Sequence, residues 1–165
     1  MVDTEFIERW LRRRDAGGGG ASAYGGGARV GVGSMVGNLT VGKKKYADVE
    51  ERMRAELVEL ADTREHLLAL IDEDARAFEP LAAAYGMPKG SDEERAAQSA
   101  ALQAALVDAC EVPLEIMATS VQVIESCVFM ARHGSVLALS DAGAAAVLAK
   151  AALQAASLNV VINIG

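Results

Sequence analysis

The sequence has few aromatic residues and few cysteines, and each shortage narrows the class of protein. Aromatic residues make up 4% of the chain, although 52% of it is apolar. Because strands favour β-branched and aromatic residues, an apolar content built largely from alanine, valine and leucine favours packed helices over a β-sandwich. The two cysteines, Cys110 and Cys127, lie in apolar helical stretches. We therefore expect buried, reduced thiols rather than a disulfide or a nucleophile.

Positive charge is also scarce, and the formal net charge of −7 argues against general binding to nucleic acid. No basic segment followed by an apolar run indicates a signal peptide. The longest nearly uncharged segment, 142–165, still carries Lys150 and several amides, which suits a buried helix better than a membrane span. We expect a soluble cytoplasmic protein with one domain over residues 1–165. Its apolar end predicts that a C-terminal helix is missing from this sequence.

Apolar residues recur at helical spacing through most of the chain. The pattern predicts helices over 4–14, 47–85, 92–110, 112–132 and 141–158, and over 29–39 if packing compensates for its glycines. Pro113 either starts a new helix or kinks a continuous one. Residues 15–27 are predicted to form a loop because of their glycine content. The expected fold is an all-α bundle of about five to six helices with a glycine-rich loop near the N-terminus.

The segment from Gly17 to Tyr46 is the first candidate site. It combines a run of glycines with three consecutive lysines, Lys43 to Lys45. Glycines let a backbone approach a ligand closely, and ammonium groups attract negative charge, so the segment predicts a pocket for an anionic small molecule. It matches neither the dinucleotide-binding nor the Walker pattern. A flexible connection followed by a solvated lysine run would explain it equally well.

Asp74 is the second candidate, because it lies between Ile71 and Phe78 on the apolar face of its helix. A carboxyl group there loses hydration, so its pKa should rise unless it is paired. It would then be a general acid or base at the bottom of a pocket. The alternative is a structural ion pair with a residue such as Arg64.

Polar residues near helix ends form a third group. Ser140 and Asp141 would cap the last helix, or would point amides and a carboxylate into a cleft. Asn38, Asn159 and Asn163 lie within apolar segments and need hydrogen-bond partners if they are buried. They would bind a heterocycle or join helix ends. No spacing of possible ligands resembles a metal site.

Seven short segments carry more information in their order than any one of them does alone. They are GGGGASAYGG, SMVGNLTVGKKKY, IDEDARAF, AYGMPKGSDEERAA, VPLEI, ALSDAGAAAVLA and LNVVIN. In this order they resemble the formiminotransferase-cyclodeaminase family, and more narrowly its stand-alone bacterial methenyltetrahydrofolate cyclohydrolase and cyclodeaminase members. The resemblance covers nearly the whole chain, and NLTVGKKKY followed by SDAG is its most specific part.

The resemblance implies an all-α homodimer that acts on a folate, polyglutamylated or not, with no metal and no cofactor beyond the folate itself. Family members hydrolyse 5,10-methenyltetrahydrofolate to 10-formyltetrahydrofolate, or cyclise 5-formimidoyltetrahydrofolate with release of ammonia. We expect the first reaction, with the second as the alternative. A third alternative is a non-catalytic folate-binding or scaffold homologue, because GGGARVGVG replaces the alanine-rich helix usual in relatives.

The resemblance also implies roles for single residues. Asp74 or Asp141 would be the proton shuttle, and Lys43 would polarise the one-carbon unit or meet the folate carboxylates. The implied substrate-binding residues are Gly18, Gly19, Asn38, Lys44, Lys45, Ser140, Asn159 and Asn163.

Overall fold

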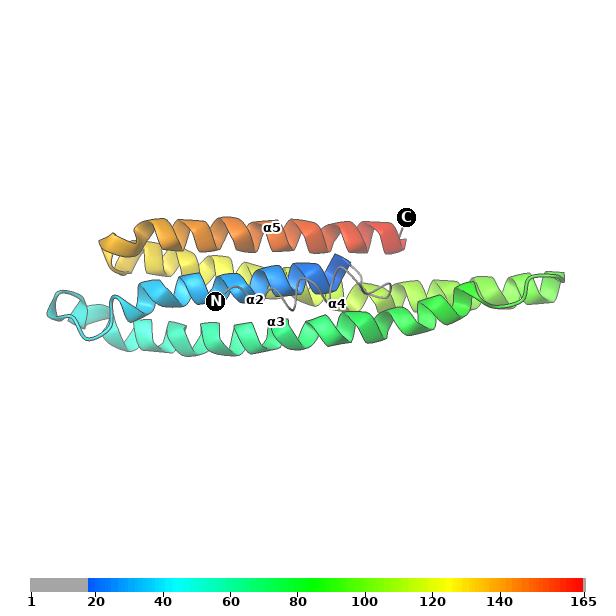
Figure 1. The fold of residues 1–165 in the computed structure, drawn as a ribbon, viewed down its shortest axis with the longest axis horizontal. Helices are drawn as coiled ribbons and strands as arrows, with labels where there is room; N and C mark the ends of the chain where they lie inside the picture. Colours follow the sequence, from blue (N-terminus) through cyan, green and yellow to red (C-terminus); the bar gives the residue numbers. More distant parts are fainter. Residues whose placement is uncertain (1–17, 165) are drawn as a thin grey trace, which may run out of the picture.

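Four long α-helices make up most of residues 18–164, which are the residues that the computed structural model describes (Figure 1). They are α2 (Gly18–Asn38), α3 (Glu50–Tyr85), α4 (Asp92–His133) and α5 (Leu139–Ile164). Short 3₁₀ helices, η1 (Lys44–Val49) and η2 (Val136–Ala138), lie in two of the connections. This part of the chain contains no strand, so the predicted all-α class is confirmed. The helix predicted over 4–14 lies outside the described residues.

Helix α2 corrects the predicted glycine-rich loop, because residues 18–27 are helical. Each glycine costs about 1 kcal/mol relative to alanine in a helix, and here packing against the other helices offsets that cost. The glycines permit close approach, since a Cβ atom on Gly37 would lie 2.7 Å from Leu57 Cδ2. A Cβ atom on Gly26 would lie 3.2 Å from Leu67 Cδ1. Tertiary packing has therefore overridden local propensity.

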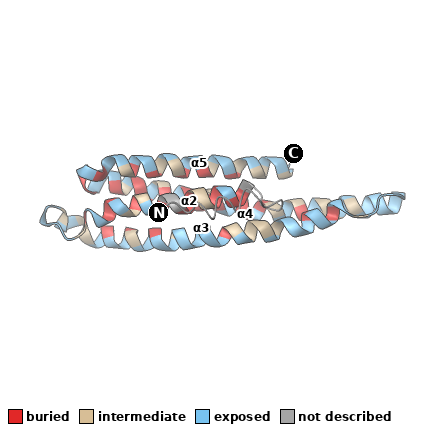
Figure 2. Ribbon diagram, viewed as in Figure 1, coloured by how far each residue is buried: buried red, intermediate tan, exposed pale blue. Residues whose placement is uncertain are grey.

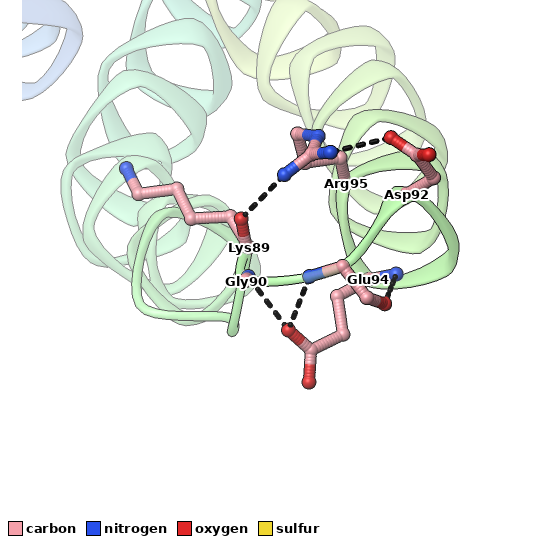
Figure 3. A network of polar contacts seen from close by, with 6 residues as sticks. Lys89, Gly90, Asp92, Glu94 and Arg95 are labelled. Atoms are coloured by element: carbon pink, nitrogen blue, oxygen red, sulfur yellow. Dashed lines mark hydrogen bonds and ion pairs between the residues drawn. The ribbon is translucent and has the colours of Figure 1, made fainter.

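Helix α4 runs unbroken through Pro113, so one helix replaces the two predicted over 92–110 and 112–132. It begins with the expected capping box (Figure 3): Glu94 N–H donates to Ser91 Oγ, and Glu94 Oε2 accepts from Ser91 N–H. Arg95 donates to the Lys89 carbonyl and pairs with Asp92. These contacts fix the tight connection between α3 and α4.

The core lies between the helices and is filled by aliphatic side chains from α3 and α4 and by small residues from α5 (Figure 2). Its fully buried side chains include Leu60, Leu67, Leu70, Ile116, Val123, Met130, Ala142 and Ala145. The alanines of α5 let that helix lie close to its neighbours. The residues predicted as a possible strand, 159–164, continue α5 as helix.

The two ends of the bundle differ (Figure 1). At one end, the connections 39–49 and 134–138 lie together, since Thr40 Oγ1 accepts a 2.8 Å hydrogen bond from Ser135 N–H and donates to Val36 O. At the other end, α3 and α4 continue as a projecting hairpin beyond the start of α2 and the end of α5. The candidate site lies where the four-helix part of the bundle ends and this two-helix hairpin begins.

Candidate functional site

Asp74 of α3 lies against the first turn of α2, where its Oδ2 accepts a 2.8 Å hydrogen bond from Gly20 N–H. The first amides of a helix have no partner within the helix and carry its positive dipole end. A carboxylate is a natural partner for them. The predicted inward position of Asp74 is confirmed in part, because the side chain is half-buried.

The contact requires glycine at position 19. A Cβ atom there would lie 2.1 Å from Asp74 Oδ1, closer than any real contact. An alanine would therefore push the carboxyl group or the start of α2 out of place. The glycine run thus supports a close approach between backbone and carboxyl group, through a helix rather than through a loop.

Burial raises the pKa of Asp74 above its ordinary value, and the hydrogen bond from Gly20 opposes the rise without cancelling it. Within residues 18–164, no ion pair joins Arg64 to Asp74. A carboxyl group whose pKa is raised in this way takes up and releases protons closer to neutral pH, which suits a general acid or base.

A cavity of about 190 Å³, here called the Asp74 pocket, opens beside this carboxyl group. Its lining residues are Asp74, Ala77, Phe78, Leu81, Ala109, Pro113, Asn159, Ile162 and Asn163. Asn163 Nδ2 donates to Ala109 O at 3.1 Å and so joins α5 to α4, and Asn159 Nδ2 donates to Ala155 O at 3.1 Å. The pocket thus combines one carboxyl group, two oriented carboxamides and an aromatic ring.

A second, more open cavity of about 440 Å³ runs between α2 and α5, and we call it the α2–α5 groove. Its walls are Ala21, Ser22, Gly25, Leu148, Ala151, Ala152, Ala155, Leu158 and Asn159. Asn159 borders both cavities, so the groove adjoins the Asp74 pocket at this residue. Its walls are mainly small and apolar, so it suits the flat, apolar part of a ligand.

The three lysines lie at the other end of the bundle, which we call the lysine end. Lys43, Lys44 and Lys45 are exposed, and Lys45 Nζ lies 5.2 Å from the centre of the Tyr46 ring. Desolvation, the largest single effect, raises the pKa of Tyr46. Hydrogen bonds with the Val136 backbone and the Ser135 side chain, together with Lys45, outweigh it, so the pKa of Tyr46 lies below its ordinary value.

The remaining predicted site residues divide between the two ends. Asn38 is the exposed last residue of α2, at the lysine end. Ser140 and Asp141 are also there, but α5 begins at Leu139, so Ser140 lies in its first turn and does not precede it as the predicted cap. Gly18 and Gly19 begin α2 beside Asp74.

The two groups are far apart within one chain. Asp74 lies 24 residues after Glu50, the first residue of α3, which corresponds to about 36 Å of helix. Lys43 to Lys45 lie five to seven residues before that helix start, at the beginning of η1. The structure therefore brings Gly18, Gly19, Asp74, Asn159 and Asn163 together and separates them from the lysines and Asp141.

A sequence profile of the formiminotransferase-cyclodeaminase family matches residues 4–165. The chain belongs to the formiminotransferase-cyclodeaminase family. It is 42% identical over 168 residues to a methenyltetrahydrofolate cyclohydrolase of Methylorubrum extorquens, an alignment that covers 99% of this chain and 81% of the relative.

Two further relatives, one of known structure, also match most of this chain. A crystal structure of formiminotetrahydrofolate cyclodeaminase from Thermotoga maritima superposes with a TM-score of 0.85 at 30% identity, covering 99% of this chain and 78% of that one. The chain is 32% identical to the formimidoyltransferase-cyclodeaminase of Gallus gallus over 90% of its own length but only 27% of that enzyme.

Two features of this chain were not predicted from its sequence. Gly20 supplies the amide that binds Asp74, and only the packing of α2 on α3 reveals that donor. Glu56 is 2% exposed on α3, where it pairs with Arg52, and its Oε2 has no hydrogen-bond partner within the described chain. Glu56 lies three residues after Met53 and four before Leu60, the same spacing that places Asp74 on the apolar face, so the sequence did carry a signal for its burial.

Possible metal ligands are not grouped in the part of this family member that the structure describes. Within residues 18–164, no three histidine, cysteine or acidic side chains are placed to hold a metal ion. By length and composition, α4 and residues 136–164 would be long and apolar enough to cross a membrane. That evidence is weak, because core helices of soluble proteins have the same character.

Proposed function

We propose that this protein hydrolyses 5,10-methenyltetrahydrofolate to 10-formyltetrahydrofolate. The observation that carries the proposal is the 42% identity to the Methylorubrum cyclohydrolase over 99% of the chain. The position of Asp74 supports it, since the reaction needs a group that moves a proton beside the one-carbon unit. We further propose a soluble, cytoplasmic homodimer that needs no metal and no cofactor beyond the folate.

In the proposed reaction, the Asp74 carboxylate takes a proton from a water molecule as that water attacks the carbon that bridges N5 and N10. The attack gives a tetrahedral carbon that carries a hydroxyl group. Asp74 then gives its proton to N5 as the bond between N5 and the carbon breaks. The hydroxyl group loses its proton as the formyl group forms on N10, so one proton is released overall.

Electrostatics and burial support this assignment to Asp74. The methenyl group carries a positive charge, which a neighbouring carboxylate attracts. The raised pKa of Asp74 makes the protonated form available for the second step. The hydrogen bond from Gly20 holds the carboxyl group in one position throughout. Asp141 lies at the other end of the bundle, so we propose Asp74 as the proton shuttle.

We place the pterin in the Asp74 pocket, where the carboxamides of Asn159 and Asn163 offer donors and acceptors to a heterocycle. The aminobenzoyl part would lie along the α2–α5 groove, which shares Asn159 with the pocket. In this arrangement the bridging carbon lies near the junction of the two cavities and beside the first turn of α2.

The test is an absorbance assay with two substrates. The proposal predicts loss of the methenyl chromophore when 5,10-methenyltetrahydrofolate is added. Appearance of that chromophore from 5-formimidoyltetrahydrofolate would favour the second candidate, a cyclodeaminase, which the Thermotoga structure supports by its name and its TM-score of 0.85. Folate binding with neither change would contradict both reactions and would favour a non-catalytic folate-binding or scaffold protein.

A further inference from the structure

A further cavity, of about 420 Å³, lies between α3 and α4 and takes no part in the proposed reaction. We call it the acidic groove. Its acidic lining residues are Glu56, Glu59 and Asp62 of α3 and Glu125 of α4, and its basic one is Arg52. Because carboxylates outnumber the single guanidinium group, the groove attracts cations and repels anions such as the folate tail.

Glu56 lines the groove with a buried carboxylate, whereas the other three acidic residues are exposed. Arg52 Nε donates to Glu56 Oε1 at 2.9 Å, and Arg52 Nη2 donates to the same oxygen. Arg52 is held in this position by Phe129, since its Cζ lies 5.5 Å from the centre of that ring. Glu56 Oε2 has no hydrogen-bond partner within residues 18–164. A buried carboxylate with one oxygen unpaired is costly, so this group requires a further donor.

The groove is elongated, because it follows two helices that pack side by side and run in opposite directions (Figure 1). On α3, its acidic residues recur at every third position from Glu56 to Asp62, over about 9 Å of helix. On α4, Gln122, Glu125 and Ser126 line the opposite wall at a spacing of three and four residues. Negative charge is therefore spread along a line rather than gathered at one point.

A linear cation matches this distribution better than a compact one. Within residues 18–164, no three acidic, histidine or cysteine side chains are close enough to hold a metal ion. A di- or polyamine instead carries several ammonium groups along a flexible chain, and each ammonium group has up to three N–H donors. The side-chain oxygens of Thr63, Gln122 and Ser126 offer additional acceptors between the carboxylates.

We propose that the acidic groove binds a linear di- or polyamine. One ammonium group donates to the Glu56 carboxylate, whose Oε2 is unpaired, and the others pair with the exposed carboxylates of Glu59, Asp62 and Glu125. Asp62 lies 12 residues before Asp74, about 18 Å of helix, so this site is separate from the Asp74 pocket. The proposal does not depend on the proposed folate chemistry.

The experiment titrates the whole protein with spermidine, a linear triamine, in a calorimeter. Sodium chloride at about 0.1 M screens attraction between exposed charges that are more than about 10 Å apart. We expect saturable binding of one spermidine per chain. A variant with Glu59→Gln, Asp62→Asn and Glu125→Gln should bind roughly tenfold more weakly or worse. It keeps the pair between Glu56 and Arg52, and its changes are on the surface, so its fold should be retained.

The matched control carries Asp48→Asn, Glu51→Gln and Glu65→Gln. These residues are exposed and lie outside the groove, and the control loses the same number and kinds of charge as the test variant. It should keep the wild-type affinity for spermidine within about twofold, since surface charges outside a site contribute little. Equal weakening in the two triple variants would show general attraction to an acidic protein and would overturn the proposal.

Glu56→Gln tests the buried carboxylate, because it keeps an oxygen for Arg52 and removes the charge. With unchanged helical content by circular dichroism, it should lower the affinity for spermidine by about tenfold. If this variant does not fold, the exposed triple variant still decides the proposal. Absence of saturable binding to the wild-type protein would overturn it, and so would magnesium chloride that displaces spermidine more strongly than sodium chloride of equal ionic strength. No folate is present, so loss of the proposed function would leave these outcomes unaffected.

Discussion

The Gly20 N–H and Asp74 Oδ2 form a 2.8 Å hydrogen bond that joins residues 54 positions apart in the sequence. It ties the first turn of α2 to the middle of α3 at the point where the four-helix part of the bundle gives way to the projecting hairpin. The bond fixes a carboxyl group with a raised pKa at the edge of a pocket. The proposed chemistry depends on that position.

Gly19→Ala should displace the Asp74 carboxyl group, because the added Cβ atom would lie 2.1 Å from its Oδ1. We expect turnover to fall by roughly a hundredfold, as a misplaced catalytic group commonly causes. The control is Gly31→Ala in the same helix, where a Cβ atom would meet nothing within 4 Å. That control should keep its turnover and gain about 1 kcal/mol in the free energy of unfolding. Equal turnover in the two variants would contradict the role of the close contact.

Asp74→Asn should raise the melting temperature at neutral pH. Because burial raises the pKa of Asp74, the folded protein binds this proton more tightly than the unfolded chain does. Stability is therefore lost as pH rises from the ordinary pKa of aspartate through the raised value, and the cost persists above it. Melting curves from pH 4 to pH 8 should show that the advantage of the Asp74→Asn variant over wild type shrinks towards low pH. A variant that is less stable at every pH would contradict this account.

Arg52→Leu should lower the free energy of unfolding by about 2 kcal/mol, because it leaves the buried Glu56 carboxylate without its partner. Glu56→Leu removes the buried carboxylate itself and so leaves no unpaired charge. It should leave the free energy of unfolding unchanged or raise it. Arg54→Leu serves as the control, since its partner Glu50 is more exposed and such surface pairs contribute little. Urea unfolding of the three variants measures the differences, and an equal loss in all three would count against the explanation.

The cysteines should not react in the native protein. Both are buried, and desolvation raises the pKa of Cys127 to about 11, so its thiolate is rare at pH 8. A colourimetric thiol reagent should label neither residue before unfolding and both in denaturant. Fast labelling of the folded protein would show that α4 opens locally.

The helical class and the inward position of Asp74 were predictable from the sequence. Apolar spacing over residues 47–85 placed Asp74 between Ile71 and Phe78, and it is half-buried as that pattern requires. The capping box at Ser91 and Glu94 was predictable too, because it depends only on neighbouring residues. Local patterns fix local structure when no distant contact opposes them.

The glycine segment was not predictable in the same way. Helix propensity favours a loop over residues 18–27, and only the packing of Gly26 and Gly37 against leucines of α3 explains the helix found there. The separation of the predicted site residues into two groups was not predictable from the sequence either. Lys43 and Asp74 lie in successive sequence motifs, but Asp74 lies 24 residues beyond the first residue of α3, and the order of the motifs does not show that distance.

The most direct test of the proposed chemistry follows the loss of the methenyl chromophore over time. The rate is measured for the wild-type protein, for Asp74→Asn and for Asp141→Asn, at one substrate concentration and across a range of pH. The account predicts that Asp74→Asn loses turnover and that Asp141→Asn keeps it. It also predicts that the wild-type rate falls on the acid side at a pH above the ordinary pKa of aspartate. Full turnover by Asp74→Asn, with loss in Asp141→Asn, would contradict the assignment of the proton shuttle.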